Sequence, residues 1–158
     1  MLPENFLNTD RVTISLDIQS KKRLLEHIAE MFAAHHERIQ ADEVFEKLIE
    51  RERLGSTGLG QGIALPHARI NGLDQAYASF IRLKQGIDFD TIDNSPVDLI
   101  LALLVPENAN EEHLQILAGL ARFFSDASNC QQLRETNDAQ TLVELIVNGV
   151  ESAQQVLN

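Results

Sequence analysis

The chain has 158 residues, a length typical of one domain, and 44% of them are hydrophobic, enough to build a core. Its 24 acidic and 13 basic side chains give a formal net charge of -11, which disfavours nucleic acid and anionic lipid as partners. Cys130 is the only cysteine, which excludes an internal disulfide and a zinc site built on cysteines. Residues 1–11 lack the basic region and continuous apolar stretch expected of a signal peptide, and no apolar run of about 20 residues occurs. We expect a soluble, cytoplasmic single domain over 1–158, its core at about 12–148, without membrane insertion.

The N-terminal third predicts one strand followed by two helices. Apolar and polar residues alternate over 12–18, which is the period of a half-buried strand. Ser20 is a suitable N-cap, and from 21 to about 36 the apolar residues follow the helical period. A second helix is expected from Asp42, as its N-cap, to a stop at Gly55.

A glycine-rich window follows, with four glycines in the eight residues from Gly55 to Gly62, and predicts a loop. It does not fit a Walker A loop, because Gln61 stands where the lysine is required. It does not fit the dinucleotide fingerprint either, because the predicted element before it is a helix rather than a strand. A nucleotide-binding enzyme is therefore the weakest of the alternatives.

Three strands are predicted in the middle of the chain. Residues 63–68 form a short apolar segment, in which Pro66 lacks an N–H donor and indicates a sheet edge or strand end beside His67. Residues 76–83 and 97–105 predict two more strands. The second of these is almost continuously apolar, which is typical of a strand covered on both faces.

The C-terminal part predicts helices. Asn110 is the expected N-cap of an amphipathic helix that carries His113 near its start. Shorter helices are expected over 130–134 and 141–148, and the polar tail after Gly149 is expected to fray. Strands interleaved with helices indicate an α/β fold, a mixed β-sheet flanked by helices on both faces.

His67 is the best candidate for chemistry among the histidines. It lies beside a loop of backbone donors, and the hydroxyls of Ser56 and Thr57 are close in sequence. A neutral imidazole is a good nucleophile near pH 7, and such a loop can stabilise an anion. A histidine at a strand end can equally be structural, so the residues alone leave both roles open.

The segment 51–67, RERLGSTGLGQGIALPH, closely resembles the active-site segment of the mannitol/fructose-type enzyme IIA family of the phosphotransferase system. The Gly-Ser-Thr-Gly sequence at 55–58, which opens the glycine-rich window, is most similar to the nitrogen-regulatory branch of that family. The runs at 93–98, 104–106 and 112–118 recur in the same order, so the resemblance extends over about residues 21–145.

The resemblance implies the fold of that family and a phosphocarrier without a metal or other cofactor. His67 would accept a phosphoryl group from a phosphohistidine on a small HPr- or NPr-like carrier. His113 would be the second active-site histidine, which positions or neutralises the phosphoryl group, and Arg51 would lie near the site. The residues expected to stabilise the phosphoryl oxygens are Ser56, Thr57, Gly58 and Gly60.

The resemblance also implies a regulatory role, in which the phosphorylation state controls partner proteins, with potassium transport proteins and sensor kinases as candidates. One alternative is a sugar-specific fructose/mannitol-type IIA component that passes phosphate to a IIB permease subunit. Another is an interaction module that no longer accepts phosphate. An apolar patch around His67 is expected to bind the carrier, with Leu59, Ile63 and Leu65 as candidate members.

Overall fold

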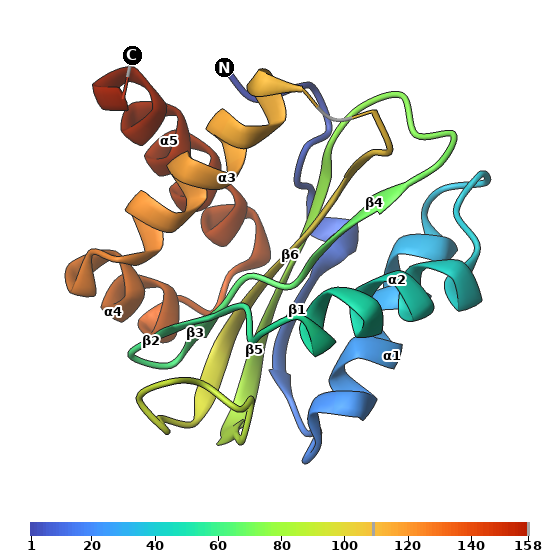
Figure 1. Ribbon diagram of the computed structural model, residues 1–158. Helices are drawn as coiled ribbons and strands as arrows, with labels where there is room; N and C mark the ends of the chain where they lie inside the picture. Colours follow the sequence, from blue (N-terminus) through green and yellow to red (C-terminus); the bar gives the residue numbers. More distant parts are fainter. Residues whose placement is uncertain (109, 158) are drawn as a thin grey trace.

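The computed structural model describes residues 1–108 and 110–157, and its centre is one mixed six-stranded sheet (Figure 1). Five strands follow the order β1-β5-β6-β3-β2, and β4 also pairs with β6. β5 and β6 are antiparallel to each other, whereas β1 is parallel to β5 and both β3 and β4 are parallel to β6. The strands are β1 (Val12–Leu16), β2 (Gly58–Gly60), β3 (Ile63–Ala64), β4 (His67–Ile70), β5 (Tyr77–Ile87) and β6 (Val97–Pro106).

Helices cover both faces of the sheet, as the sequence predicts (Figure 1). The helices are α1 (Lys21–Ala34), α2 (Ala41–Arg53), α3 (Glu111–Phe124), α4 (Ala127–Glu135) and α5 (Ala139–Leu157), with a short 3-10 turn at Thr9–Arg11. α1 and α2 enclose one hydrophobic core, and α3, α4 and α5 enclose the other. β6 separates them, because Leu101 lies in the α3 core and Ala102 in the α1 core. This explains its nearly continuous apolar sequence.

Two of the three predicted helix starts are confirmed. The side chain of Ser20 accepts a hydrogen bond from the backbone N–H of Arg23, and that of Asn110 accepts one from Glu112. The prediction of Asp42 as an N-cap is wrong, because α2 already begins at Ala41. Asp42 lies in the first turn instead, where a carboxylate is favoured by the helix dipole.

The predicted strand over 63–68 is interrupted. Pro66 has no N–H, and the N–H of Leu65 donates to the carbonyl of Thr57, outside the β6 pairing. The segment therefore splits into β3 and β4, and His67 opens β4 instead of following a strand. Two further predictions differ from the structure. The strand predicted over 12–18 ends at Leu16, and the glycine-rich window, predicted as a loop, contains the short strand β2.

The prediction of a frayed tail after Gly149 is wrong. α5 continues to Leu157, and Val150 and Ala153 on the far side of that glycine are buried. α3 and α5 pack closely here, since a Cβ at Gly149 would lie 2.2 Å from Cε1 of Phe123. Tertiary packing thus extends the helix beyond the polar pattern. Within the described residues, no helix is long and apolar enough to cross a membrane.

Candidate active site

A pocket of about 650 Å³ lies between α2 and the start of α3, over β4 and β6. His67 enters it as the first residue of β4, His113 as the third residue of α3, and Arg51 from the last turn of α2. The structure therefore brings three predicted site residues together. The complete lining of the pocket is Lys47, Glu50, Arg51, Leu54, His67, Ala68, Arg69, Leu103, Val105, Glu107, His113, Leu114 and Leu117.

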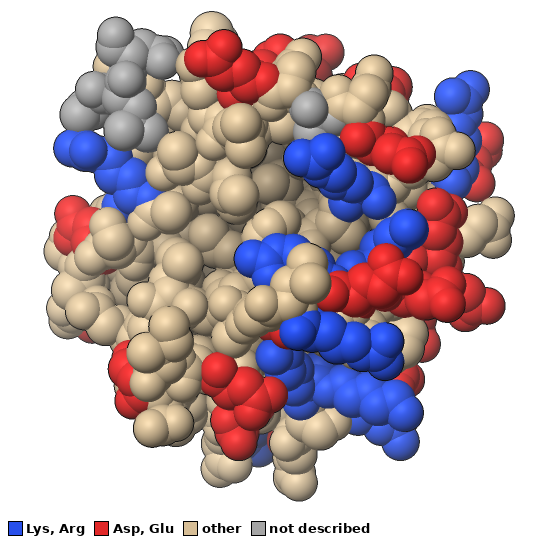
Figure 2. Space-filling view, viewed as in Figure 1, with Lys and Arg blue, Asp and Glu red and all other residues tan. Residues whose placement is uncertain are grey.

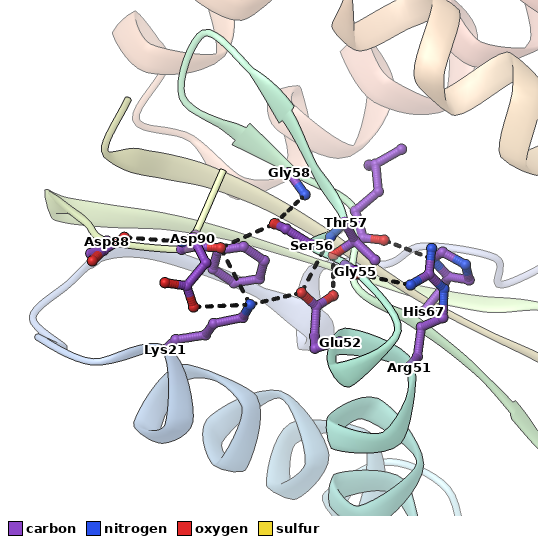
Figure 3. Close-up of polar contacts among 12 residues, drawn as sticks. Lys21, Arg51, Glu52, Gly55, Ser56, Thr57, Gly58, His67, Asp88 and Asp90 are labelled. Carbon is purple, nitrogen blue, oxygen red and sulfur yellow. Dashed lines mark hydrogen bonds and ion pairs between the residues drawn. The ribbon is translucent and has the colours of Figure 1, made fainter. Parts of the chain in front are cut away.

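The half-buried ring of His67 is held by the backbone. Its Nδ1 lies 2.8 Å from the carbonyl oxygen of Leu65, and since a carbonyl can only accept, Nδ1 carries the proton (Figure 3). Burial lowers the pKa of His67, the Leu65 carbonyl opposes this by favouring the protonated ring, and the positive charge of Arg51 lowers the pKa further. The ring is therefore neutral near pH 7, with an unprotonated, nucleophilic Nε2.

His113 is held in the opposite tautomer. The backbone N–H of Asn110 donates to its Nδ1 at 3.1 Å, as part of a capping box at the start of α3. A neutral ring that accepts at Nδ1 must carry its proton at Nε2. The pocket is thus lined by one imidazole with a free Nε2 lone pair and by a second one with an Nε2–H donor.

The pocket carries more positive than negative side chains, in contrast to the acidic chain as a whole. Three cations, Lys47, Arg51 and Arg69, line it against the two carboxylates Glu50 and Glu107. Arg51 is braced by a 2.9 Å hydrogen bond from its Nη1 to the carbonyl of Gly55. On the face seen in Figure 2, Lys and Arg lie on the α2 side of a largely uncharged centre, interleaved with Asp and Glu. Such a site favours a phosphoryl group.

The four predicted phosphoryl-stabilising residues lie elsewhere, because Ser56, Thr57, Gly58 and Gly60 are outside the pocket lining. The Ser56 hydroxyl donates to the carbonyl of Phe89 at 3.0 Å and accepts from the N–H of Gly58 at 3.0 Å (Figure 3). The Thr57 hydroxyl donates to Glu52. These groups fix the shape of the loop, so the geometry gives no support to their direct contact with phosphoryl oxygens.

The turn between β2 and β3 is held by side chains from other parts of the chain. Asp93 accepts hydrogen bonds from the backbone N–H groups of Gln61 and Ser95 and from the hydroxyls of Thr91 and Ser95, and these lower its pKa to about 2. Arg134 of α4 makes two hydrogen bonds to Asp98 and a third to the carbonyl of Gln61. The run 93–98, which recurs in the family resemblance, thus holds the glycine-rich hairpin.

The predicted apolar patch is wrong in two of its three members. Ile63 and Leu65 are buried, with 1% and 3% of their surface exposed, and Leu59 is exposed but does not line the pocket. The exposed leucines of the pocket wall are Leu54 and Leu114, at 85% and 63% exposure. Their sequence signal is an apolar residue in an otherwise polar helix turn.

Sequence reasoning also missed Lys47 and Arg69, whose charges on a helix and a strand resemble ordinary solvated positions. In the part of the chain that the structure describes, no group of three or more His, Cys, Asp or Glu residues is arranged to hold a metal ion.

Comparison with known proteins identifies the family. Residues 5–149 match the family model "Phosphoenolpyruvate-dependent sugar phosphotransferase system, EIIA 2". The chain is 40% identical over 145 residues to the nitrogen regulatory protein of Pseudomonas aeruginosa, covering 92% of this chain and 94% of that protein. It is 41% identical over 143 residues to the nitrogen regulatory protein of Klebsiella oxytoca, covering 90% of this chain and 88% of that protein.

Solved structures give the same result. The crystal structure of nitrogen regulatory protein IIA-Ntr from Neisseria meningitidis matches with a TM-score of 0.85 and 41% identity, covering 89% of this chain and 96% of that one. The mannitol IIA of Escherichia coli, at 21% identity, covers 89% and 98% of the two chains with a TM-score of 0.73 and supports the fold. The chain belongs to the type 2 enzyme IIA family of the phosphotransferase system. Within it, these identities place the chain in the nitrogen-regulatory branch.

Proposed function

We propose that the protein is a phosphocarrier in which Nε2 of His67 accepts a phosphoryl group from a phosphohistidine of an HPr- or NPr-like carrier. The observation that carries this proposal is the complementary pair of imidazoles on one pocket. In the neutral His67 ring, the carbonyl of Leu65 holds the proton on Nδ1 and so leaves Nε2 with a free lone pair, and the hydrogen bond from Asn110 leaves His113 with an Nε2–H donor. One ring can attack while the other donates to a phosphoryl oxygen.

In the transfer step, the lone pair on Nε2 forms the new N–P bond as the N–P bond pair of the carrier returns to the carrier's ring. The carrier ring, protonated at its other nitrogen, leaves neutral, and its positive charge passes to the ring of His67. The Leu65 carbonyl at Nδ1 stabilises that charge, because a hydrogen bond strengthens when its donor becomes ionised. The transition state is loose, so positioning and charge stabilisation account for most of the catalysis. Arg51, Lys47 and Arg69 supply the nearby positive charge.

The rim of the pocket suits a protein donor. Leu54 follows α2 on one side and Leu114 belongs to α3 on another, and both side chains are largely exposed. Exposed apolar side chains that surround a reactive group are typical of a protein interface. We propose that the carrier covers these leucines and so excludes water from the phosphoryl group during transfer.

The regulatory part of the proposal follows from charge. Phosphorylation of His67 adds nearly two negative charges beside Arg51, Lys47 and Arg69, which changes how this face attracts a charged partner. The proteins that respond are proposed to be cytoplasmic regulatory targets, with potassium transport proteins and sensor kinases as candidates. Equal affinities of the unphosphorylated and phosphorylated forms for such partners would contradict this part.

Intact-mass analysis tests the phosphocarrier proposal directly. Wild type and His67→Ala are incubated with phosphoenolpyruvate, enzyme I and either a sugar-branch or a nitrogen-branch carrier. We expect one acid-labile phosphoryl group on wild type and none on His67→Ala, with circular dichroism showing that the variant is folded. A phosphoryl group on the variant would assign the acceptor elsewhere. Failure of wild type with both carriers would favour the interaction module, and onward transfer to a fructose-type IIB would favour the sugar-specific alternative.

A further inference from the structure

A largely buried ion pair between Glu52 and Lys21 lies behind the glycine-rich loop. Glu52 is next to the pocket residue Arg51 in sequence, but neither member of the pair lines the pocket. Glu52 follows Arg51 on α2, and its side chain is only 5% exposed. Its Oε1 lies 2.9 Å from Nζ of Lys21, the first residue of α1 (Figure 3). A buried carboxylate is costly unless it is paired and hydrogen-bonded, so this arrangement requires a structural or functional reason.

Glu52 binds the loop through one residue, Thr57. The backbone N–H of Thr57 donates to Oε1 of Glu52 at 3.2 Å, and the Thr57 hydroxyl donates to Oε2. Thr57 is itself buried. Both carboxylate oxygens are therefore used to hold one peptide unit and one side chain of the loop in a fixed orientation.

Hydrogen bonds continue from Thr57 to the acceptor histidine. The carbonyl of Thr57 accepts the N–H of Leu65 at 3.0 Å, and the carbonyl of Leu65 accepts Nδ1–H of His67 at 2.8 Å. Lys21, Glu52, Thr57, Leu65 and His67 thus form one connected series, and four of these five residues are labelled in Figure 3. Leu65 is the link, since its N–H fixes it to the loop and its carbonyl determines the tautomer of His67.

The position of Lys21 is also constrained. Its Nζ lies 3.3 Å from the carbonyl of Phe89 and 4.4 Å from the centre of the Phe89 ring. Asp90 contributes a second, exposed carboxylate at 3.7 Å. The ammonium is thereby held against Glu52 by groups from the connection between β5 and β6, which also receives the Ser56 hydroxyl at the carbonyl of Phe89.

We propose that Glu52, held by Lys21, is a positioning residue for phosphoryl transfer, which acts through Thr57 and Leu65 to keep His67 in the tautomer with an unprotonated Nε2. This inference rests on the proposed function, in which His67 is the acceptor. It gives Thr57 a role behind the histidine in place of the direct phosphoryl contact that the family resemblance implies. Substitution of Glu52 should therefore alter the reactivity of His67 without altering the pocket lining.

The tautomer is measured by nitrogen NMR of the histidine rings in the unphosphorylated protein, and the transfer rate is measured separately with excess phosphorylated carrier. We compare Glu52→Gln and Thr57→Val with two controls. Thr57→Ser keeps both donors to Glu52, and Glu46→Gln removes an exposed carboxylate from the same helix. For Glu52→Gln and Thr57→Val we expect a mixture of His67 tautomers and a transfer rate lower by about 10- to 100-fold. The two controls should match wild type.

Wild-type tautomer and rate in folded Glu52→Gln and Thr57→Val would overturn the inference. So would a lower rate with an unchanged tautomer, because that result indicates a structural role only. If Glu52→Gln does not fold, Thr57→Val decides, since valine preserves the shape of threonine and removes the hydroxyl alone. If wild type accepts no phosphate on His67, the proposed function fails, while the NMR spectra still show whether Glu52 determines the tautomer.

Discussion

The two imidazoles of the pocket show how single backbone groups determine chemistry. His67 and His113 are the same side chain, yet the carbonyl of Leu65 makes Nδ1 a donor in one, and the N–H of Asn110 makes Nδ1 an acceptor in the other. The donor or acceptor role of each Nδ1 follows directly, because a carbonyl cannot donate and a backbone N–H cannot accept. The different roles proposed for the two rings follow from these contacts.

His113→Gln separates the imidazole from its capping role. Glutamine at this position of a capping box can still accept from the N–H of Asn110, so we expect the free energy of unfolding to change by less than about 0.5 kcal/mol. Loss of a preorganised donor to a developing anion should lower the transfer rate by about 100-fold. Urea denaturation and quench-flow transfer assays measure the two effects. An undiminished rate would remove His113 from the site.

His67 should titrate below the ordinary imidazole value of 6.5, because burial disfavours its charged form. The unfolded chain then binds a proton that the folded chain does not, so this residue makes the free energy of unfolding fall as the pH drops below about 6.5. Proton NMR titration measures the midpoint. Denaturation of wild type and His67→Gln above and below that pH should show a smaller loss for the variant, and an equal loss would contradict the shift.

At the scale of elements, the site depends on how helix ends meet strand starts. α2 ends where Arg51 reaches the pocket, α3 begins where His113 does, and β4 begins at His67. The break at Pro66 is essential to this arrangement, since it frees the Leu65 carbonyl to bind the histidine ring. At the start of α3 the positive end of the helix dipole favours an anion, whereas at the end of α2 the negative end is offset by the charge of Arg51.

Gly149→Ala tests the packing that extends α5. Alanine is favoured over glycine in a helix by about 1 kcal/mol, but the added Cβ would approach Cε1 of Phe123 to 2.2 Å, and overpacking costs about 1–3 kcal/mol. We therefore expect a net loss of about 1 kcal/mol in the free energy of unfolding, measured by urea denaturation. Asn148→Ala, at an exposed neighbour, is the control and should stabilise slightly. A stabilised Gly149→Ala would show that Phe123 can move aside.

For the whole molecule, the distribution of charge matters more than its total. The chain has a formal net charge of -11, but the pocket lining has three cations and two carboxylates. The proposed phosphoryl group would therefore meet local attraction within an acidic protein, while the exposed leucines would offer the proposed carrier contact that does not depend on charge.

Leu54→Ser and Leu114→Ser test the proposed docking surface. Each should raise the KM for the phosphorylated carrier by about 10-fold, or about 1.4 kcal/mol, with little change in kcat, because the leucines contact the carrier and not the phosphoryl group. Ile92→Ser is the matched control, since Ile92 is 98% exposed but does not line the pocket. Equal effects of all three substitutions on KM would argue against a defined docking surface.

Much of the fold could be predicted from local patterns. Alternation identified β1, the continuous apolar run identified β6 as covered on both faces, and Ser20 and Asn110 marked helix starts. Such features depend on neighbours a few residues apart, so they are visible in the sequence. The extent of α5 was not, because its last turns are held by contacts with α3 rather than by their own composition.

The candidate site divides in the same way. The sequence by itself indicated the family, because the segment 51–67 resembles the active-site segment of that family. That resemblance implied the roles expected of His67, His113 and Arg51. Only the tertiary structure decided which groups share the pocket and that Thr57 lies behind it, held by Glu52. It also decided the tautomers, because each depends on a contact with one backbone group in the folded chain. Such contacts depend on strand register and on where a helix ends, which residue types alone do not specify.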